Sequence, residues 1–119
     1  MIEYFELSCY GFFGPHNSLV IDFIKEEYTY SVFNEGRRWT EKVTLTPSKL
    51  KKLQKALGTY GFSSWGAKYL DSTVLDGTKW HLKVSFDGND YQSEGSNAFP
   101  SNWKKMIAAI DRYLDIDMT

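Results

Sequence analysis

Alternating apolar and polar residues predict most of the strands in this chain. The clearest case is residues 78–86, whose apolar and polar side chains take turns along the sequence: Trp80, Leu82, Val84 and Phe86 against Lys79, His81, Lys83 and Ser85. Successive side chains of a strand point to opposite faces, so this strand has an apolar face and a polar, partly basic face. A shift of one residue in register would expose all four apolar side chains, so we expect the facing to be strongly determined.

The same alternation predicts further strands, at 2–9, 18–25, 28–34 and 38–45, with a partner for 78–86 that begins over Tyr91–Glu94. Asn34-Glu35-Gly36 and Asp87-Gly88-Asn89 have the composition of hairpin turns. Short connections of this kind favour antiparallel pairing between consecutive strands.

Two segments have helical spacing instead. The first begins at Thr46-Pro47, a good N-cap followed by proline where its missing N–H costs nothing, and ends at Gly58 or Gly61. The second runs from about Pro100 to Leu114, with apolar residues along one face. Residues 62–77 follow neither period, and we expect a loop or a short strand there.

These elements predict one α+β domain that spans residues 1–119. We expect an antiparallel sheet of about five or six strands with both helices packed on one face, in the order βββ(β)-α-ββ-α. A chain of 119 residues fits a single domain with its own core.

Composition and charge narrow the functional classes. The aromatic content of 17% favours strands and interfaces, while a net charge of −1 argues against broad binding of nucleic acid along its backbone. Cys9 is the single cysteine, so no intramolecular disulfide can form. No apolar run approaches a membrane span and no leader sequence is evident, so we expect a soluble protein of the cytoplasm.

Cys9 is the one candidate nucleophile. With His16 or His81 as the base, it suggests a small hydrolase or transferase. The structural interpretation is favoured, because Cys9 shares a strand face with Phe5 and Leu7 and a free cysteine commonly behaves as a small buried hydrophobe. The acidic residues and the two histidines lack metal-ligand spacing, and no cofactor motif is present, so we expect neither a metal nor a cofactor.

The polar row of the 78–86 strand is a candidate anion or nucleic-acid surface. Lys79, His81 and Lys83 share that face, and Lys42 joins them if neighbouring strands bring it close. The alternative is an ordinary solvated face that pairs with Gln92 or Glu94 on the next strand.

Two other segments are candidate binding sites. Ser96, Asn97 and Asn102 lie where the last helix begins and would hold an anion there, although a structural corner clamped by Phe99 and Trp103 explains the same residues. In the 11–16 loop, three residues form either an exposed interaction patch or a plug at the end of the sheet: Phe12, Phe13 and His16.

The last third of the chain resembles a group of small uncharacterised bacterial or phage proteins. The resemblance rests on Trp80-x-Leu82-x-Val84-x-Phe86 and on a Gly-Ser-Asn-x-x-Pro corner, Gly95 to Pro100, that leads into the final helix. It implies a fold and an origin but no activity.

The leading prediction is therefore a non-enzymatic binding or protein-interaction module. Its partner would be another protein or a second copy of this chain through an exposed sheet face or edge. The cysteine enzyme and the local anion or nucleic-acid surface remain the alternatives, and we expect no membrane partner and no extensive nucleic-acid contact.

Overall fold

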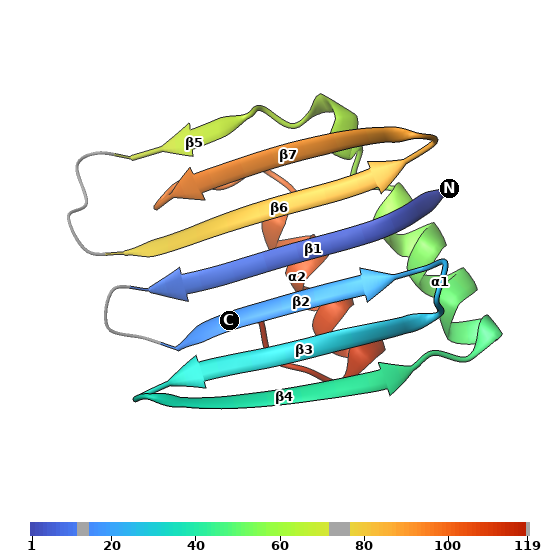
Figure 1. Ribbon diagram of the computed structural model, residues 1–119. Helices are drawn as coiled ribbons and strands as arrows, with labels where there is room; N and C mark the ends of the chain where they lie inside the picture. The colour runs from blue at the N-terminus through green and yellow to red at the C-terminus, as the bar shows by residue number, and fades with distance from the viewer. Residues whose placement is uncertain (12–14, 72–76, 119) are drawn as a thin grey trace.

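One seven-stranded sheet and two α-helices make up the part of the chain that the structure describes, residues 1–11, 15–71 and 77–118 (Figure 1). The structure is a computed structural model. The elements in chain order are β1 (Ile2–Gly11), β2 (His16–Asp22), β3 (Glu27–Asn34), β4 (Arg37–Thr44), α1 (Pro47–Gly58), the 3-10 turn η1 (Phe62–Ser64), β5 (Lys68–Leu70), β6 (Thr78–Phe86), β7 (Asn89–Ser96) and α2 (Trp103–Leu114). The predicted α+β class is confirmed.

The strands follow the order β4-β3-β2-β1-β6-β7-β5 across the sheet. Neighbouring strands are antiparallel, except that β5 runs parallel to β7. The predicted antiparallel sheet of five or six strands is thus corrected to a mixed sheet of seven in the described part of the chain. The correction comes from β5, a strand of three residues inside 62–77. A strand this short has no readable period, and its pairing depends on the path by which the chain returns from α1.

The core lies between one face of the sheet and the two helices (Figure 1). Leu7 of β1 sits opposite Leu19 of β2 and Leu82 of β6, and all three side chains are buried. The helices contribute their apolar stripes to the same core: Leu50, Leu53 and Leu57 from α1, and Trp103, Met106, Ile107, Ile110 and Leu114 from α2. The expectation that both helices pack on one face is therefore met.

Element boundaries differ from the predicted ones where local hydrogen bonds intervene. The strand predicted over 18–25 runs instead from His16 to Asp22. The Asp22 carboxylate accepts the N–H groups of Ile24 and Lys25 at 3.0 and 2.9 Å, which turns the chain early. The final helix likewise begins at Trp103 rather than near Pro100.

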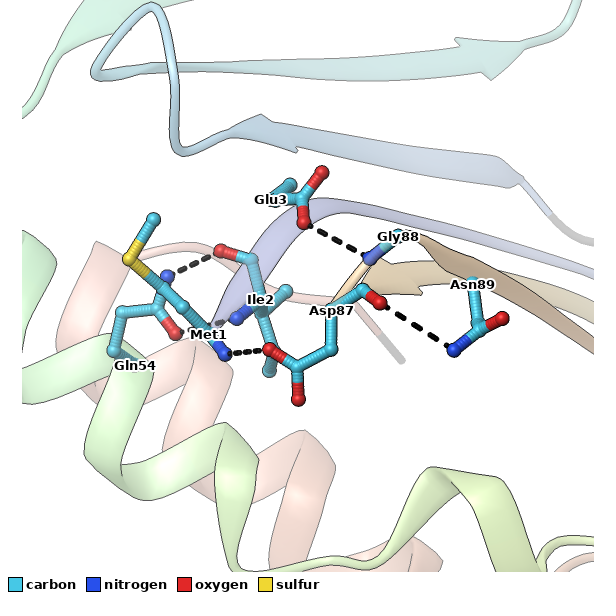
Figure 2. A network of polar contacts seen from close by, with 7 residues as sticks. All are labelled: Met1, Ile2, Glu3, Gln54, Asp87, Gly88 and Asn89. Carbon is cyan, nitrogen blue, oxygen red and sulfur yellow. Dashed lines mark hydrogen bonds and ion pairs between the residues drawn. The ribbon is translucent and has the colours of Figure 1, made fainter.

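A glutamine fixes α1 against the start of β1. Figure 2 shows the side-chain amide of Gln54 reaching the backbone of Ile2. Its Oε1 accepts the N–H of Ile2 at 2.9 Å, and its Nε2 donates to the carbonyl oxygen of the same residue. Because β1 is central in the sheet, this pair of bonds sets the position of the helix relative to the whole sheet.

Candidate functional site

Both described helices lie on one face of the sheet, and we call the other face the open face (Figure 1). From Tyr4 onward, alternation along β1 places Tyr4, Glu6, Ser8 and Tyr10 there, while Phe5, Leu7 and Cys9 point to the helices. The register across neighbouring strands then determines which open-face side chains become neighbours. That register is the information that the sequence pattern did not contain.

Five strands bring an exposed row of aromatic and basic residues together at one end of the open face. The register pairs Arg38 with Phe33, Phe33 with His16, His16 with Tyr10, and Tyr10 with Lys79. We call these five residues the aromatic–basic row. Strands are spaced about 4.8 Å apart, so the row extends roughly 19 Å.

The rings of the aromatic–basic row are accessible to a ligand. Phe33 and Tyr10 are 44% and 40% exposed. The ring centroids of Tyr10 and His16 are 5.0 Å apart, and the guanidinium of Arg38 lies 6.0 Å from the centroid of Phe33. No carboxylate belongs to the row, and its two cations, Arg38 and Lys79, lie at its two ends.

The opposite end of the open face has the opposite character. There the register lines up Glu27 with Asp22, Asp22 with Tyr4, Tyr4 with Ser85, and Ser85 with Asp90. The net charge of −1 therefore includes a group of carboxylates at this end of the open face, while Arg38 and Lys79 of the aromatic–basic row lie at the other end. A local cationic surface is compatible with a slightly acidic chain for this reason.

A groove of about 410 Å³ continues the aromatic–basic row over β1, β6, β7 and β5. Tyr10 and Lys79 form one part of it, and Lys68, His81 and Glu94 form another. Lys68 lies 4.0 Å from Glu94, which sits opposite His81 on the neighbouring strand. The groove thus combines cations, one carboxylate and an imidazole on an exposed surface.

The predicted basic patch is only partly assembled. Lys79, His81 and Lys83 share the open face, as their alternation predicted. Lys83 sits opposite Glu6 and 5.9 Å from the ring centroid of Tyr4, toward the acidic end. Lys42 does not join this patch, because four strand steps, roughly 19 Å, separate β4 from β6. The open-face residues that lie in register between Lys42 and Lys83 are Thr29, Val20 and Glu6, none of them a cation.

Lys42 has a different neighbour. Its Nζ lies 3.2 Å from a carboxylate oxygen of Glu27 on the adjacent strand. This ion pair places Lys42 on the open face but outside the aromatic–basic row, which makes it a useful reference cation.

Cys9 is not brought together with either histidine. Ser8 sits opposite His81 and Tyr10 sits opposite His16 on the open face, so the intervening Cys9 points to the helices. The sheet therefore separates the thiol from both imidazoles. Burial, reinforced by the negative charge of Asp111, raises the pKa of Cys9 to about 12. A thiol with that pKa is protonated at neutral pH, and the arrangement gives no support to nucleophilic catalysis.

The corner that contains Ser96 and Asn97 has a structural explanation. Asn97 adopts a left-handed backbone (φ 59°), and its N–H donates to the carbonyl of Thr78 at 2.9 Å. Its side chain packs so closely on Gly77 that a Cβ there would lie 1.5 Å from Oδ1. Ser96 belongs to the groove on the open face, opposite Lys79. Asn102 donates from Nδ2 to the carbonyl of Tyr60 at 2.9 Å, away from an anion site at the helix start.

The remaining aromatic residues lie either against the core or outside the described residues. Trp65 packs against Phe62 and Trp80, with ring centroids 5.0 and 6.1 Å apart, so it belongs to the aromatic cluster around Trp80 and not to a surface patch. Phe12 and Phe13 lie outside the described residues.

The described residues contain no group of three His, Cys, Asp or Glu side chains placed to hold a metal ion. In the same part of the chain, neither helix has the length and apolar character needed to cross a bilayer.

Sequence reasoning missed two members of the aromatic–basic row. Phe33 falls on the outward face of the 28–34 alternation, and His16 and Lys79 are among the predicted candidates, but Tyr10 and Arg38 carried no signal of their own. They become a site only through the pairing of five strands.

Comparisons with known proteins add no assignment. A scan against models of protein families finds no match, and a search of curated proteins finds no relative. The resemblance of the last third of the chain to small bacterial proteins therefore stays a prediction.

Proposed function

We propose that this protein is a non-enzymatic binding module and that the open face of the sheet is its binding surface. The aromatic–basic row is the single observation that carries this proposal. Large rings at 44% and 40% exposure on a helix-free face are costly to leave in water unless a partner uses them. The separation of Cys9 from both histidines, and its protonated thiol, favour binding over catalysis.

The ligand class that fits the row best is an extended anion with planar groups, of which single-stranded nucleic acid is the leading example. Exposed rings stack on bases, and flanking cations such as Arg38 and Lys79 contact phosphates. The row is long enough to follow several nucleotides across the strands. The carboxylates at the other end of the face would confine such a ligand to this end.

A protein partner is the second candidate. An acidic segment of a protein would also pair with the cations and fill the groove, but it would gain less from the flat rings of Tyr10 and Phe33.

We propose the cytoplasm as the location of the protein. A reduced, buried Cys9 and the absence of any disulfide are consistent with action there.

Fluorescence anisotropy with labelled 12-mers of deoxythymidine and uridine at low salt tests the leading candidate. We expect binding that weakens as salt is raised. The Tyr10→Ala variant should lose about tenfold in affinity because it removes a stacking surface. Tyr10→Phe should retain the affinity because it keeps the ring.

A pair of lysine variants provides the matched control. Lys79→Ala should lower the affinity and reduce the salt dependence, since it removes a phosphate contact. Lys42→Ala removes a cation from the same face but outside the row, and should leave the affinity unchanged. Binding of a labelled poly-glutamate peptide but of neither oligonucleotide would instead favour the protein partner. Equal effects of Lys79→Ala and Lys42→Ala would contradict a site at the row.

A further inference from the structure

The β4 strand is a long edge with an exposed outer side. Seven of its eight residues are exposed, and Val43 is intermediate. Among the described strands, none pairs with the side of β4 that faces away from β3. The opposite edge of the sheet is β5, which has only three residues. An eight-residue edge of this kind is a template for pairing with another strand.

The turn before β4 determines which backbone groups face outward. Glu35 and Gly36 both have positive φ values, 53° and 77°, and form a two-residue turn closed by Asn34 and Arg37. Such a turn is closed by a hydrogen-bonded pair of residues. Hydrogen-bonded and non-hydrogen-bonded pairs then alternate along the hairpin. Arg37 and the odd-numbered residues after it therefore bond to β3. The N–H and C=O groups that point outward belong to Arg38, Thr40, Lys42 and Thr44.

We propose that two copies of this chain pair through their β4 strands, antiparallel about a two-fold axis centred on Trp39. The pairing would extend both sheets into one, with the helical layers on the same side. It uses the sheet edge and not the open face, so it goes beyond the binding function proposed above. Three observations on β4 select the second copy as the occupant and set its register.

Charge selects the register. A two-fold axis perpendicular to the sheet must pass beside a residue that pairs with its own copy. If the axis passed beside Arg38, Glu41 or Lys42, that charged residue would lie opposite the same residue of the second copy. If it passed beside Thr40, Arg38 would lie opposite Lys42 of the second copy. Like charges directly opposite one another destabilise a sheet. Centres nearer the ends of the strand overlap too few residues.

Centring on Trp39 has the opposite result. It places Arg37 opposite Glu41 of the second copy, and Glu41 opposite Arg37, which gives two complementary pairs. Within the described residues, neither of these side chains forms an ion pair in the single chain. The backbone groups of Arg38 and Thr40 then face each other and can exchange hydrogen bonds.

Trp39 itself favours this centre. It is 53% exposed, although its ring contacts Tyr30 edge-on at 5.9 Å between centroids. Its backbone points to β3, so across the new interface it would form a non-hydrogen-bonded pair, in which opposite side chains come closest. Aromatic pairs are stabilising at such positions. The dimer would bury a side chain that the single chain leaves half in water.

Light scattering behind a sizing column, over a range of protein concentrations, tests the proposal. The wild type should approach the mass of two chains as concentration rises. Arg37→Glu and Glu41→Arg should each raise the dimer dissociation constant about tenfold or more, because each creates two like-charge pairs. The double variant Arg37→Glu/Glu41→Arg should restore the dimer, since both pairs become complementary again.

The controls separate loss of pairing from loss of folding. The charge reversal Arg112→Glu, on the surface of α2, should leave the dimer intact. Circular dichroism of each single variant should match the wild type, because Arg37 and Glu41 are exposed. A wild type with the mass of one chain at every concentration would overturn the proposal. So would single variants that dimerise normally, or a double variant that stays monomeric.

Discussion

Gly95 shows how one residue controls the junction between β7 and the last helix. The indole of Trp80 crosses this position, and its Nε1 donates to the carbonyl of Ala98 at 2.9 Å. A Cβ at Gly95 would lie 2.3 Å from that Nε1 and 2.6 Å from the Ala98 oxygen. The absence of a side chain is therefore required for the tryptophan to reach its hydrogen bond. This explains the Gly-Ser-Asn corner as a packing device.

Replacing Gly95 by alanine should destabilise the fold. The added methyl must displace the indole and the backbone of Ala98, and overpacking of this kind costs about 1–3 kcal/mol. Urea unfolding, followed by circular dichroism, measures the change. Gly58→Ala is the matched control, because nothing lies within 4 Å of its Cβ position at the end of α1. That control should be neutral or slightly stabilising. Equal midpoints for the two variants would contradict the packing role.

The start of α1 shows how an element can be determined locally. Thr46 is the N-cap, its Oγ1 accepts the N–H of Lys49 at 3.2 Å, and Pro47 follows at the first helical position. The first turn contains no acidic residue to interact favourably with the positive end of the helix dipole. The threonine hydroxyl is therefore the main stabilising group at this end.

Removing that hydroxyl should weaken the helix by a measurable amount. Thr46→Ala should lower the free energy of unfolding by about 1 kcal/mol, the usual cost of losing an N-cap. Ser48→Ala, at an exposed position within the first turn, should have little effect. Thermal unfolding of both variants tests the difference. A Thr46→Ala variant as stable as Ser48→Ala would show that packing alone positions the helix.

The whole molecule has a covered face and an open face with different chemistry. Cys9 lies on the covered face at 5% exposure, and the aromatic–basic row lies on the other. Cys9 also lines a pocket of about 280 Å³ together with Asn17, Trp103 and Met118, and its 5% exposure limits the access of a reagent to the thiol. Reactivity of Cys9 is therefore a measure of how far this region opens.

Labelling of Cys9 with a thiol reagent at pH 8 should be slow in the native protein and fast in denaturant. Burial raises the pKa of Cys9 from 9.0 to about 12 in the folded state, so the thiol stays protonated to a higher pH in the folded protein than in the unfolded chain. The stability that the protonated Cys9 contributes is fully present below pH 9 and is lost as the pH rises toward 12. The Cys9→Ala variant should lack that part of the alkaline loss. Rapid native labelling at pH 8 would contradict the buried thiol.

Local pattern determined a large part of this structure. Alternation assigned the facing of Trp80, Leu82 and Val84, because a strand that is half buried must place every second side chain in the core. Capping chemistry located the start of α1 at Thr46. The burial of Cys9 also followed from its strand face. Each of these depends on residues that are close together in the chain.

Only the tertiary structure decided the rest. β5 acquired its parallel pairing from the path of the chain after α1, and the separation of Lys42 from Lys79 came from the strand order. The row that joins Arg38 to Tyr10 likewise exists only because five strands are paired in one register. Pairing energies between distant strands depend on loops, packing and hydrogen bonds summed over the whole sheet. A local sequence pattern contains the facing of each strand but not its neighbours.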